Sequence, residues 1–317
     1  MTRILDSWET LQTLDLALWI AGPSLHYREY DDLARIPKVA YLRLWTTDRL
    51  GFVEADDAIT RVLDHRRVLH FSSLPAGVTS SLLRMGLYPA LRELHISGAS
   101  PMSILPLLDS KVGHGSLRCL TMQDSFTLSR ASPNESTIIR FDHLRPLLAF
   151  RYLESLVLLV SRNSEGAYGF SLNDAAWRNL AEAFPRLHTI CVRGDPKIEM
   201  APEFILPTYM AIVHLVRHCH RLTTIALVIA DDASEHDPQE MADLPTGIHV
   251  QNLSLLHSRI RDYGFVENCI TAMFPFLTTL SRRVYDLDSP PPSLTGEVRL
   301  ESWDEPLRKI QGRCRPS

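Results

Sequence analysis

The chain has 317 residues, of which 45% are hydrophobic and 22% are charged, and its formal net charge at pH 7 is -4. A chain of this length and composition can bury a full core, either as one elongated unit or as two compact domains. The slightly acidic balance argues against a nucleic-acid-binding surface, which needs clustered lysines and arginines.

Residues Met1 to Glu9 contain no basic segment followed by an apolar run, so we expect no secretory signal. No stretch approaches the roughly 18 apolar residues that a membrane span needs, and we expect no membrane contact. The five cysteines are widely spaced and form no C-x-x-C pair, which favours reduced thiols over disulfides or a zinc ribbon. These features predict a cytoplasmic or nuclear protein.

One apolar pattern recurs along the chain, in which a short segment carries large apolar residues at its first, fourth and sixth positions. Successive copies begin 25 to 36 residues apart, at Leu11, Val39, Arg66, Leu91, Leu117, Leu153, Leu187, Leu222, Val250 and Leu277. The copy at Arg66 is weak and the copy at Leu277 is incomplete. This L-x-x-L-x-L skeleton at such a period is typical of leucine-rich repeats, in which each copy supplies one short strand.

Within each copy the apolar residues alternate with a period of two residues, as in a strand. Between the copies the period changes to about 3.6 residues, which predicts helices. The expected helices cover residues 55–65, 78–87, 143–150, 172–184, 209–218 and 265–274. Pro185 and Pro275 each follow a predicted helix and would end it. We therefore predict an α/β leucine-rich-repeat solenoid, a curved shell with short parallel strands on the concave face and helices on the convex face.

The predicted solenoid covers residues 1–288 with about nine to ten irregular repeats, and residues 1–10 would cap its first unit. The period breaks at Ser289, where three prolines, Pro290 to Pro292, begin a different composition. Residues 289–317 are predicted to form a proline-rich linker and a C-terminal tail.

The repeats resemble those of fungal F-box-like leucine-rich-repeat proteins, in which irregular P-x-L-x-x-L-x-L units alternate with helices. The units at Tyr88 to Ile96 and at Phe184 to Val192 carry this resemblance, which covers about residues 8–288. It implies that the repeats select a protein partner, and that an F-box upstream of Met1 would dock onto the adaptor of a cullin-RING ubiquitin ligase. No recognisable F-box precedes the first repeat, and Ser73 to Leu83 matches the opening of one only faintly.

Residues that alternate with the core positions of each strand should point to the concave face. The early repeats place polar and aromatic side chains there, beginning with Asp15. The predicted partner-binding residues are Tyr41, Arg43, Trp45, His70, Glu93, His95, Thr121 and Gln123. The later repeats place mainly apolar side chains there, at Val157, Leu159, Cys191, Ala226, Val228 and Leu256. The alternative is that the polar residues are ordinary solvated strand positions and that the C-terminal tail covers the apolar ones.

Four insertions follow consecutive strands, at residues 124–137, 161–169, 193–204 and 231–244. Insertions at one point of a repeat project from one edge of a solenoid, so we expect a single cluster of loops. The acidic run from Asp231 to Asp237 could attract a basic peptide or a cation, although such a run is usually a solvated loop.

The most metal-like group combines His214 and His218, one helical turn apart, with Cys219 and His220. We interpret it as a polar helix face, because Leu215 stands where a metalloprotease helix has its glutamate and no third ligand is evident. Phosphate-binding loops, dinucleotide fingerprints and nucleophile elbows are absent from the sequence.

These observations predict a non-catalytic protein-recognition module that needs no metal and no cofactor. The resemblance favours the substrate-binding part of a ubiquitin-ligase receptor. The alternative is a repeat protein that regulates an enzyme, either as a GTPase-activating protein or as an inhibitor.

Overall fold

A computed structural model describes residues 13–17, 41–45, 67–72, 76–99, 101–123, 136–159, 162–163, 166–199, 204–231, 244–260 and 263–281. The predicted N-terminal cap, the predicted helix at 55–65 and the predicted C-terminal tail lie outside these residues.

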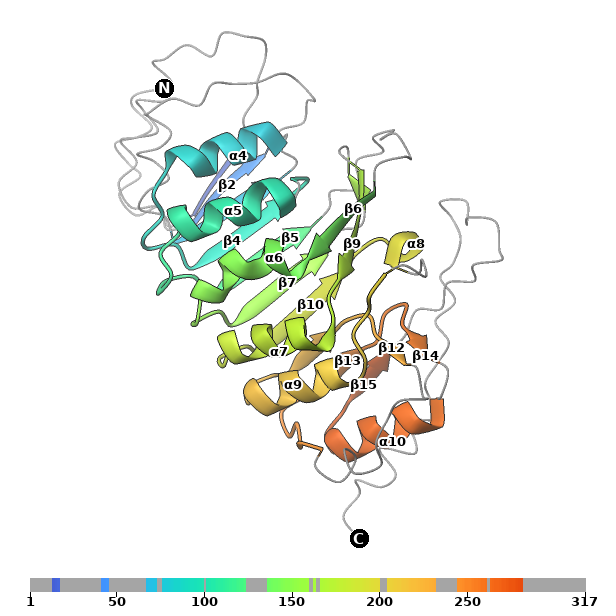
Figure 1. The fold of residues 1–317 in the computed structure, drawn as a ribbon. Coiled ribbons are helices and arrows are strands. Elements are labelled where there is room, and N and C mark those ends of the chain that lie inside the picture. The colour runs from blue at the N-terminus through green and yellow to red at the C-terminus, as the bar shows by residue number, and fades with distance from the viewer. Residues whose placement is uncertain are drawn as a thin grey trace, which may run out of the picture.

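Within the described residues, ten short strands form one parallel sheet in chain order (Figure 1). They are β1 (Thr13–Ala17), β2 (Tyr41–Trp45), β3 (Val68–Ser72), β4 (Glu93–Ser97), β5 (Cys119–Gln123), β7 (Ser155–Leu159), β10 (Thr189–Arg193), β11 (Thr224–Ala226), β13 (Asn252–Ser254) and β15 (Thr279–Ser281). Each strand contains the fourth position of one predicted repeat, and the strands from β1 to β10 also contain the sixth, so the repeat pattern located every strand of this sheet.

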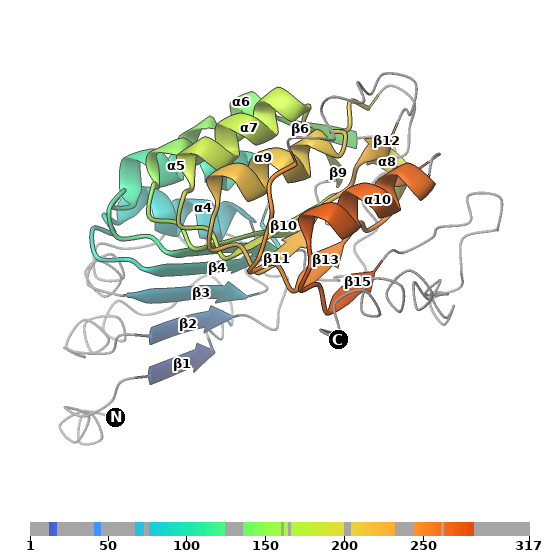
Figure 2. The same ribbon diagram turned by 90° about the horizontal axis from the view of Figure 1, so that it is seen from below.

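Helices connect most of these strands and cover one face of the sheet, which arches away from them toward both ends (Figure 2). They are α4 (Ala76–Met85), α5 (Pro101–Lys111), α6 (Phe141–Leu144) with the 3-10 helix η1 (Arg145–Ala149), α7 (Asp174–Ala183), α9 (Met210–His218) and α10 (Tyr263–Met273). This is the architecture of a leucine-rich-repeat solenoid. No helix among the described residues has the length and apolar character needed to cross a membrane.

Helix α5 was missed because two prolines interrupt its sequence. Pro101 stands at its first residue, where a missing N–H costs nothing, whereas Pro106 lies inside the helix. The buried side chains Ile104, Leu105 and Leu108 hold the helix against the core nevertheless. The ends predicted from Pro185 and Pro275 are confirmed, since α7 ends at Ala183 and α10 at Met273.

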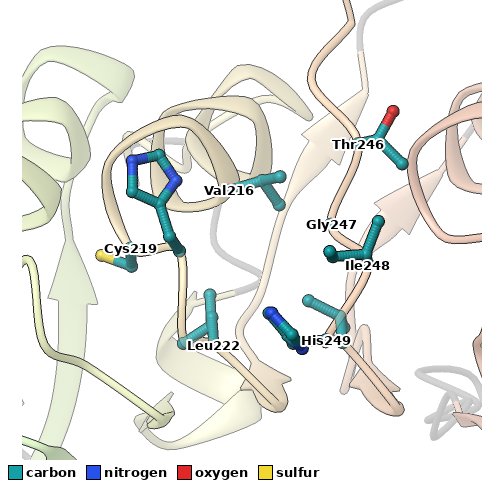
Figure 3. A pocket seen from close by; sticks show the side chains of 9 residues that line it. Val216, Cys219, Leu222, Thr246, Gly247, Ile248 and His249 are labelled. Carbon is teal, nitrogen blue, oxygen red and sulfur yellow. The ribbon is translucent and has the colours of Figure 1, made fainter.

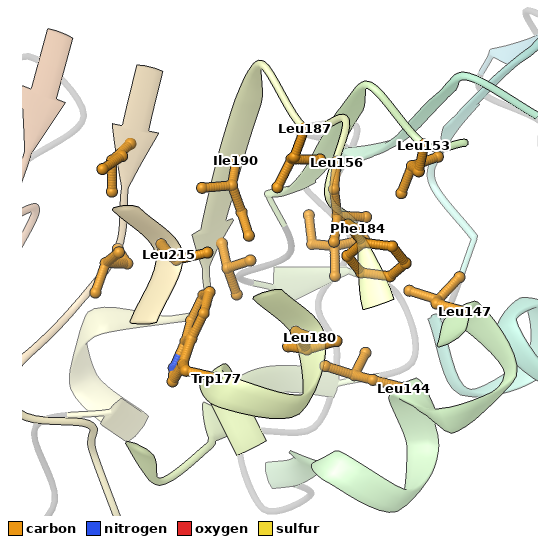
Figure 4. Packing of buried hydrophobic residues seen from close by; sticks show 14 of the residues in the cluster. Leu144, Leu147, Leu153, Leu156, Trp177, Leu180, Phe184, Leu187, Ile190 and Leu215 are labelled. Carbon is orange, nitrogen blue, oxygen red and sulfur yellow. The ribbon is translucent and has the colours of Figure 1, made fainter. Parts of the chain in front are cut away.

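The core is built from continuous rows of apolar side chains that run across the strands. The strand register places the fourth residue of each repeat beside that of the next, in the row Leu69, Leu94, Leu120, Leu156, Ile190, Ile225, Leu253 and Leu280. All eight are at most 5% exposed. Figure 4 shows Leu156 and Ile190 of this row packed with the helix residues Trp177 and Leu180. Each repeat therefore buries its apolar face only by stacking on its neighbours.

A repeated backbone hydrogen-bond pattern begins the strands of the main sheet from β4 onward. The N–H groups of Arg92 and Glu93 both donate to the carbonyl of Arg67, and those of Arg118 and Cys119 both donate to the carbonyl of Arg92. The same pattern continues through the later repeats to Thr278 and Thr279. These hydrogen bonds fix the start of β4 and of the later strands of the main sheet at the same edge.

The four predicted insertions do gather at one edge, but part of each is ordered as secondary structure. Here β6 (Ser136–Arg140) pairs in parallel with β9 (Gly166–Ser171), β8 (Arg162–Asn163) pairs antiparallel with β9, and β12 (Ala230–Asp231) pairs with β14 (Arg259–Ile260). Tyr168 and Phe170 of β9 are buried, as is Ile139 of β6. The prediction of a loop cluster was therefore wrong for these segments, because Ile139, Tyr168 and Phe170 are buried in the main hydrophobic core and hold them in place.

Candidate functional site

The open face of the sheet carries the residues that alternate with the core. In β3, β4, β5, β7 and β10 the burial pattern alternates strictly between buried and partly exposed residues. The register aligns His70, His95, Thr121, Val157 and Cys191 in one row along this face. The polar part of the row thus comes from β3 to β5, as the sequence predicted.

Polar side chains contact one another at the β3–β4 end of the row. The imidazole rings of His70 and His95 lie 5.5 Å apart, and His95 Nε2 lies 3.6 Å from Glu93 Oε2. The side chains of His95 and Glu93 are 31% and 45% exposed, so both can reach a partner. On the neighbouring strand Thr121 is partly exposed and Gln123 is exposed.

Strand β2 extends this row by backbone register. Arg43 lies opposite His70, Trp45 opposite Ser72, and Tyr41 opposite Val68. The strand therefore brings the backbone of all three predicted residues next to the polar part of the row. The structure does not describe where their side chains lie.

The apolar half of the open face is smaller than predicted. Ala226, Val228 and Leu256 are each at most 7% exposed, and the last two pack with Leu206 in a separate apolar cluster. Strands β11 and β13 end at Ala226 and Ser254, so the alternation stops before Val228 and Leu256. Leu256 also has a positive φ of 46°. Assigning these two residues to the open face was wrong, whereas Val157, Leu159 and Cys191 remain partly exposed there.

The described cysteines, Cys119, Cys191, Cys219 and Cys269, are free thiols. Burial raises the pKa of Cys219 to about 12 and that of Cys191 to about 11. The positive charge of Arg193 lowers the pKa of Cys191, but by less than burial raises it. Burial, followed by the charges of Glu93 and Glu154, also raises the pKa of Cys119. The Sγ of Cys219 donates to the carbonyls of Ala181 and Phe184 at 3.6 and 3.3 Å.

We expect Cys219 to resist alkylation in the folded protein, because only about one thiol in ten thousand is ionised at pH 8 when the pKa is near 12. Mass spectrometry after iodoacetamide treatment, with and without urea, measures this protection. Equal labelling of Cys219 in both states would contradict the burial of its side chain.

The predicted histidine group does not come together as a ligand set. His218 Nε2 lies 3.9 Å from Glu182 Oε1, and the Cys219 thiol is buried beside helix α7. Burial, the largest effect, lowers the pKa of His214. In the part of the chain that the structure describes, no three histidine, cysteine or acidic side chains gather in a way that could hold a metal ion.

His220 instead lines an open pocket of about 180 Å³ between the end of α9 and the turn before β13. Figure 3 shows Leu222 and His249 at one end of this pocket and Thr246 at the other, with Val216 on its helix side. Its lining is mixed, and it opens at the edge where the strands begin.

The site that sequence reasoning missed is a buried pair between Glu199 and His257. Glu199 ends the short helix α8 (Pro196–Glu199), and its Oε2 lies 2.7 Å from Nε2 of His257. Its Oε1 accepts hydrogen bonds from the backbone N–H groups of Phe170 and Gly194, at 2.8 and 3.0 Å. Both side chains are only 2% exposed. The pair therefore ties the small sheet of the insertions to the end of β10 and to the segment after β13.

Gly194 makes this arrangement possible through close packing. A Cβ atom at this position would lie 2.5 Å from Glu199 Oε1 and 2.7 Å from the Cα of Gly169. A larger residue would displace the carboxyl group, so glycine is required here.

No protein-family model and no curated protein matches this sequence significantly. Among solved structures, the chain is similar to one described as the Rad7 and Elc1 complex in yeast, with 17% identity, a TM-score of 0.46, and coverage of 91% of this chain and 74% of that one. It is also similar to the leucine-rich repeat-containing protein LegL7 from Legionella pneumophila, with 15% identity, a TM-score of 0.45, and coverage of 98% and 95%.

Proposed function

We propose that this solenoid is a non-catalytic protein-recognition module and that its partner binds the open face over β2 to β5. The proposed contact residues are Tyr41, Arg43, Trp45, His70, Glu93, His95, Thr121 and Gln123. The observation that carries the proposal is the row of aligned, partly exposed polar side chains on consecutive strands, in which His95 contacts both His70 and Glu93.

This arrangement suits protein recognition for physical reasons. Parallel strands hold neighbouring side chains about 4.8 Å apart on a rigid frame, so little conformational entropy is lost on binding. Tryptophan, tyrosine and arginine are also the residues that contribute most binding energy at protein interfaces.

The double variant Arg43→Ala/Trp45→Ala tests this face, together with the single variant His95→Ala. We expect both to reduce recovery of the specific partner in affinity purification by about tenfold while the melting temperature changes little. The exposed Thr279→Ala, on β15 at the far end of the same face, is the control and should recover the partner normally. Unchanged recovery by both test variants would refute the proposed surface.

We further propose, from the resemblance of the repeat units to F-box-like receptors, that the partner is a ubiquitin-ligase substrate. The same purification distinguishes this role from enzyme regulation. Recovery of a cullin adaptor together with the partner supports the ligase role, whereas stoichiometric recovery of a GTPase or another enzyme alone supports the regulatory one.

A further inference from the structure

Arginines line the edge of the solenoid where helices end and strands begin. We name the following six residues the arginine edge, one from each of six consecutive repeats: Arg67, Arg92, Arg118, Arg151, Arg186 and Arg221. Each lies in the turn that leads into a strand of the main sheet. In Figure 2 this is the edge at which the arrows of β1 to β3 begin.

Backbone hydrogen bonds set the spacing of this edge. Arg67, Arg92 and Arg118 occupy the same position in successive repeats, since the N–H of Arg92 donates to the carbonyl of Arg67 and that of Arg118 to the carbonyl of Arg92. Neighbouring strands lie about 4.8 Å apart, so these three charges follow one another closely. In the next three repeats the same position is held by Glu154, His188 and Thr223, and Arg151, Arg186 and Arg221 lie two or three residues before it. The protein as a whole carries a net charge of -4, and the concentration of cations here is therefore a local feature.

These charges are largely uncompensated. Five of the six arginines are exposed, Arg118 being the exception. Among the arginines of this edge, and within the described ranges, an ion pair is found at Arg118 alone. Its Nε lies 3.9 Å from Oε1 of Glu154. Adjacent exposed cations repel one another, and a bound anionic partner would reduce this electrostatic repulsion.

Part of the edge is held in a fixed arrangement by an aromatic ring. The guanidinium carbon of Arg118 lies 4.7 Å from the centre of the Tyr152 ring, and that of Arg186 lies 4.6 Å from it. Arg118 also donates to the carbonyl of Tyr152. Stacking on one ring orders both guanidinium groups before any partner arrives, which reduces the entropy lost on binding.

The same edge exposes large apolar side chains. Of the five large apolar side chains that are most exposed among the described residues, four lie in segments that lead into strands of the main sheet: Leu87, Tyr152, Ile248 and Phe276, at 59%, 40%, 53% and 62% exposure. Cations near helix carboxyl ends are favoured by the helix dipole, but that effect does not place apolar groups beside them. Mixed basic and apolar exposure is instead typical of a protein-binding surface.

We propose that the arginine edge binds an acidic protein segment that also carries apolar side chains. This second surface is distinct from the open face and does not depend on the function proposed for that face. The carboxylates of such a segment would pair with the guanidinium groups, and its apolar side chains would cover Leu87, Ile248 and Phe276.

A nucleic acid fits the same edge less well. Tyr152 is the exposed aromatic ring closest to the arginines in sequence, and two guanidinium groups already stack on it, so it does not offer a free face to a base. The overall negative charge also opposes a long polyanion, whereas a short acidic segment responds mainly to the charges beside it.

Fluorescence anisotropy with two labelled probes tests the proposal on the full chain. One probe is a short peptide of glutamates interspersed with leucines, and the other is oligodeoxythymidylate of the same length. We expect the peptide to bind at low salt and to bind more weakly as salt is added. The triple variant Arg151→Glu/Arg186→Glu/Arg221→Glu should weaken peptide binding by at least about tenfold.

The matched control reverses the same number of charges on the helix side, with Arg140→Glu/Arg145→Glu/Arg178→Glu. It should retain most of the affinity, and circular dichroism should show that both variants are folded. Equal losses in the two triple variants would overturn the proposal, because the effect would then be one of net charge. Tighter binding of the oligonucleotide than of the peptide would also overturn it.

Discussion

Replacing Leu156 with aspartate unfolds the protein. Leu156 is completely buried in the row formed by the fourth residues of the repeats, between Leu120 on β5 and Ile190 on β10. Burying an unpaired carboxylate there would cost more than the few kcal/mol by which proteins of this kind are usually stable. Because each repeat is stabilised by stacking on its neighbours, the loss spreads in both directions along the solenoid.

The milder Leu156→Ala variant makes this expectation measurable by urea denaturation. It removes buried methyl groups and leaves a cavity, so the free energy of unfolding should fall by about 2–5 kcal/mol. The matched control is Val157→Thr, the next residue along β7, whose side chain lies on the open face and is partly exposed. We expect the control to cost less than about 1 kcal/mol. Equal costs for the two variants would contradict the division of the strand into a core side and an open side.

Replacing Glu199 with alanine destabilises the insertion edge strongly. The substitution removes the partner of His257 and leaves the N–H groups of Phe170 and Gly194 without their acceptor, all within a buried region. Removing one member of a buried pair typically costs about 3–5 kcal/mol. We therefore expect a loss of this size in urea denaturation, with faster hydrogen exchange in β9 and α8.

The variant Glu199→Gln is the control for this prediction. Its amide oxygen can still accept from Phe170 and Gly194, so it should retain a large part of the stability that alanine loses. A change below about 1 kcal/mol for Glu199→Ala would show that the pair does not hold the insertions to the main sheet.

The sequence predicted the main sheet well because the repeat pattern is local. Leu91, Leu94 and Ile96 lie within six residues, and their alternation identifies both the strand and the face that it buries. The same argument located the open-face residues Glu93 and His95. It failed at Val228 and Leu256 because the alternation of a strand carries no signal for where the strand stops.

The contacts made at long range could not be predicted in this way. Glu199 and His257 are 58 residues apart, and neither belongs to a repeated position. Helix α5 escaped detection because Pro106 breaks the expected pattern of a helix. The arginine edge did have a signal, since Arg67, Arg92 and Arg118 each follow the first residue of a repeat copy. The repeat pattern was used only to find apolar positions, so this signal was missed.

The central claim is that adjacent residues of one strand have separate roles, with the buried residue supporting the fold and the open-face residue contacting the partner. The direct test measures both unfolding free energy and partner recovery for Leu94→Ala and His95→Ala. We predict that Leu94→Ala lowers stability by about 2–5 kcal/mol. We predict that His95→Ala keeps the stability and loses about tenfold in recovery. A His95→Ala variant that lost stability as Leu94→Ala does, or that recovered the partner normally, would contradict the claim.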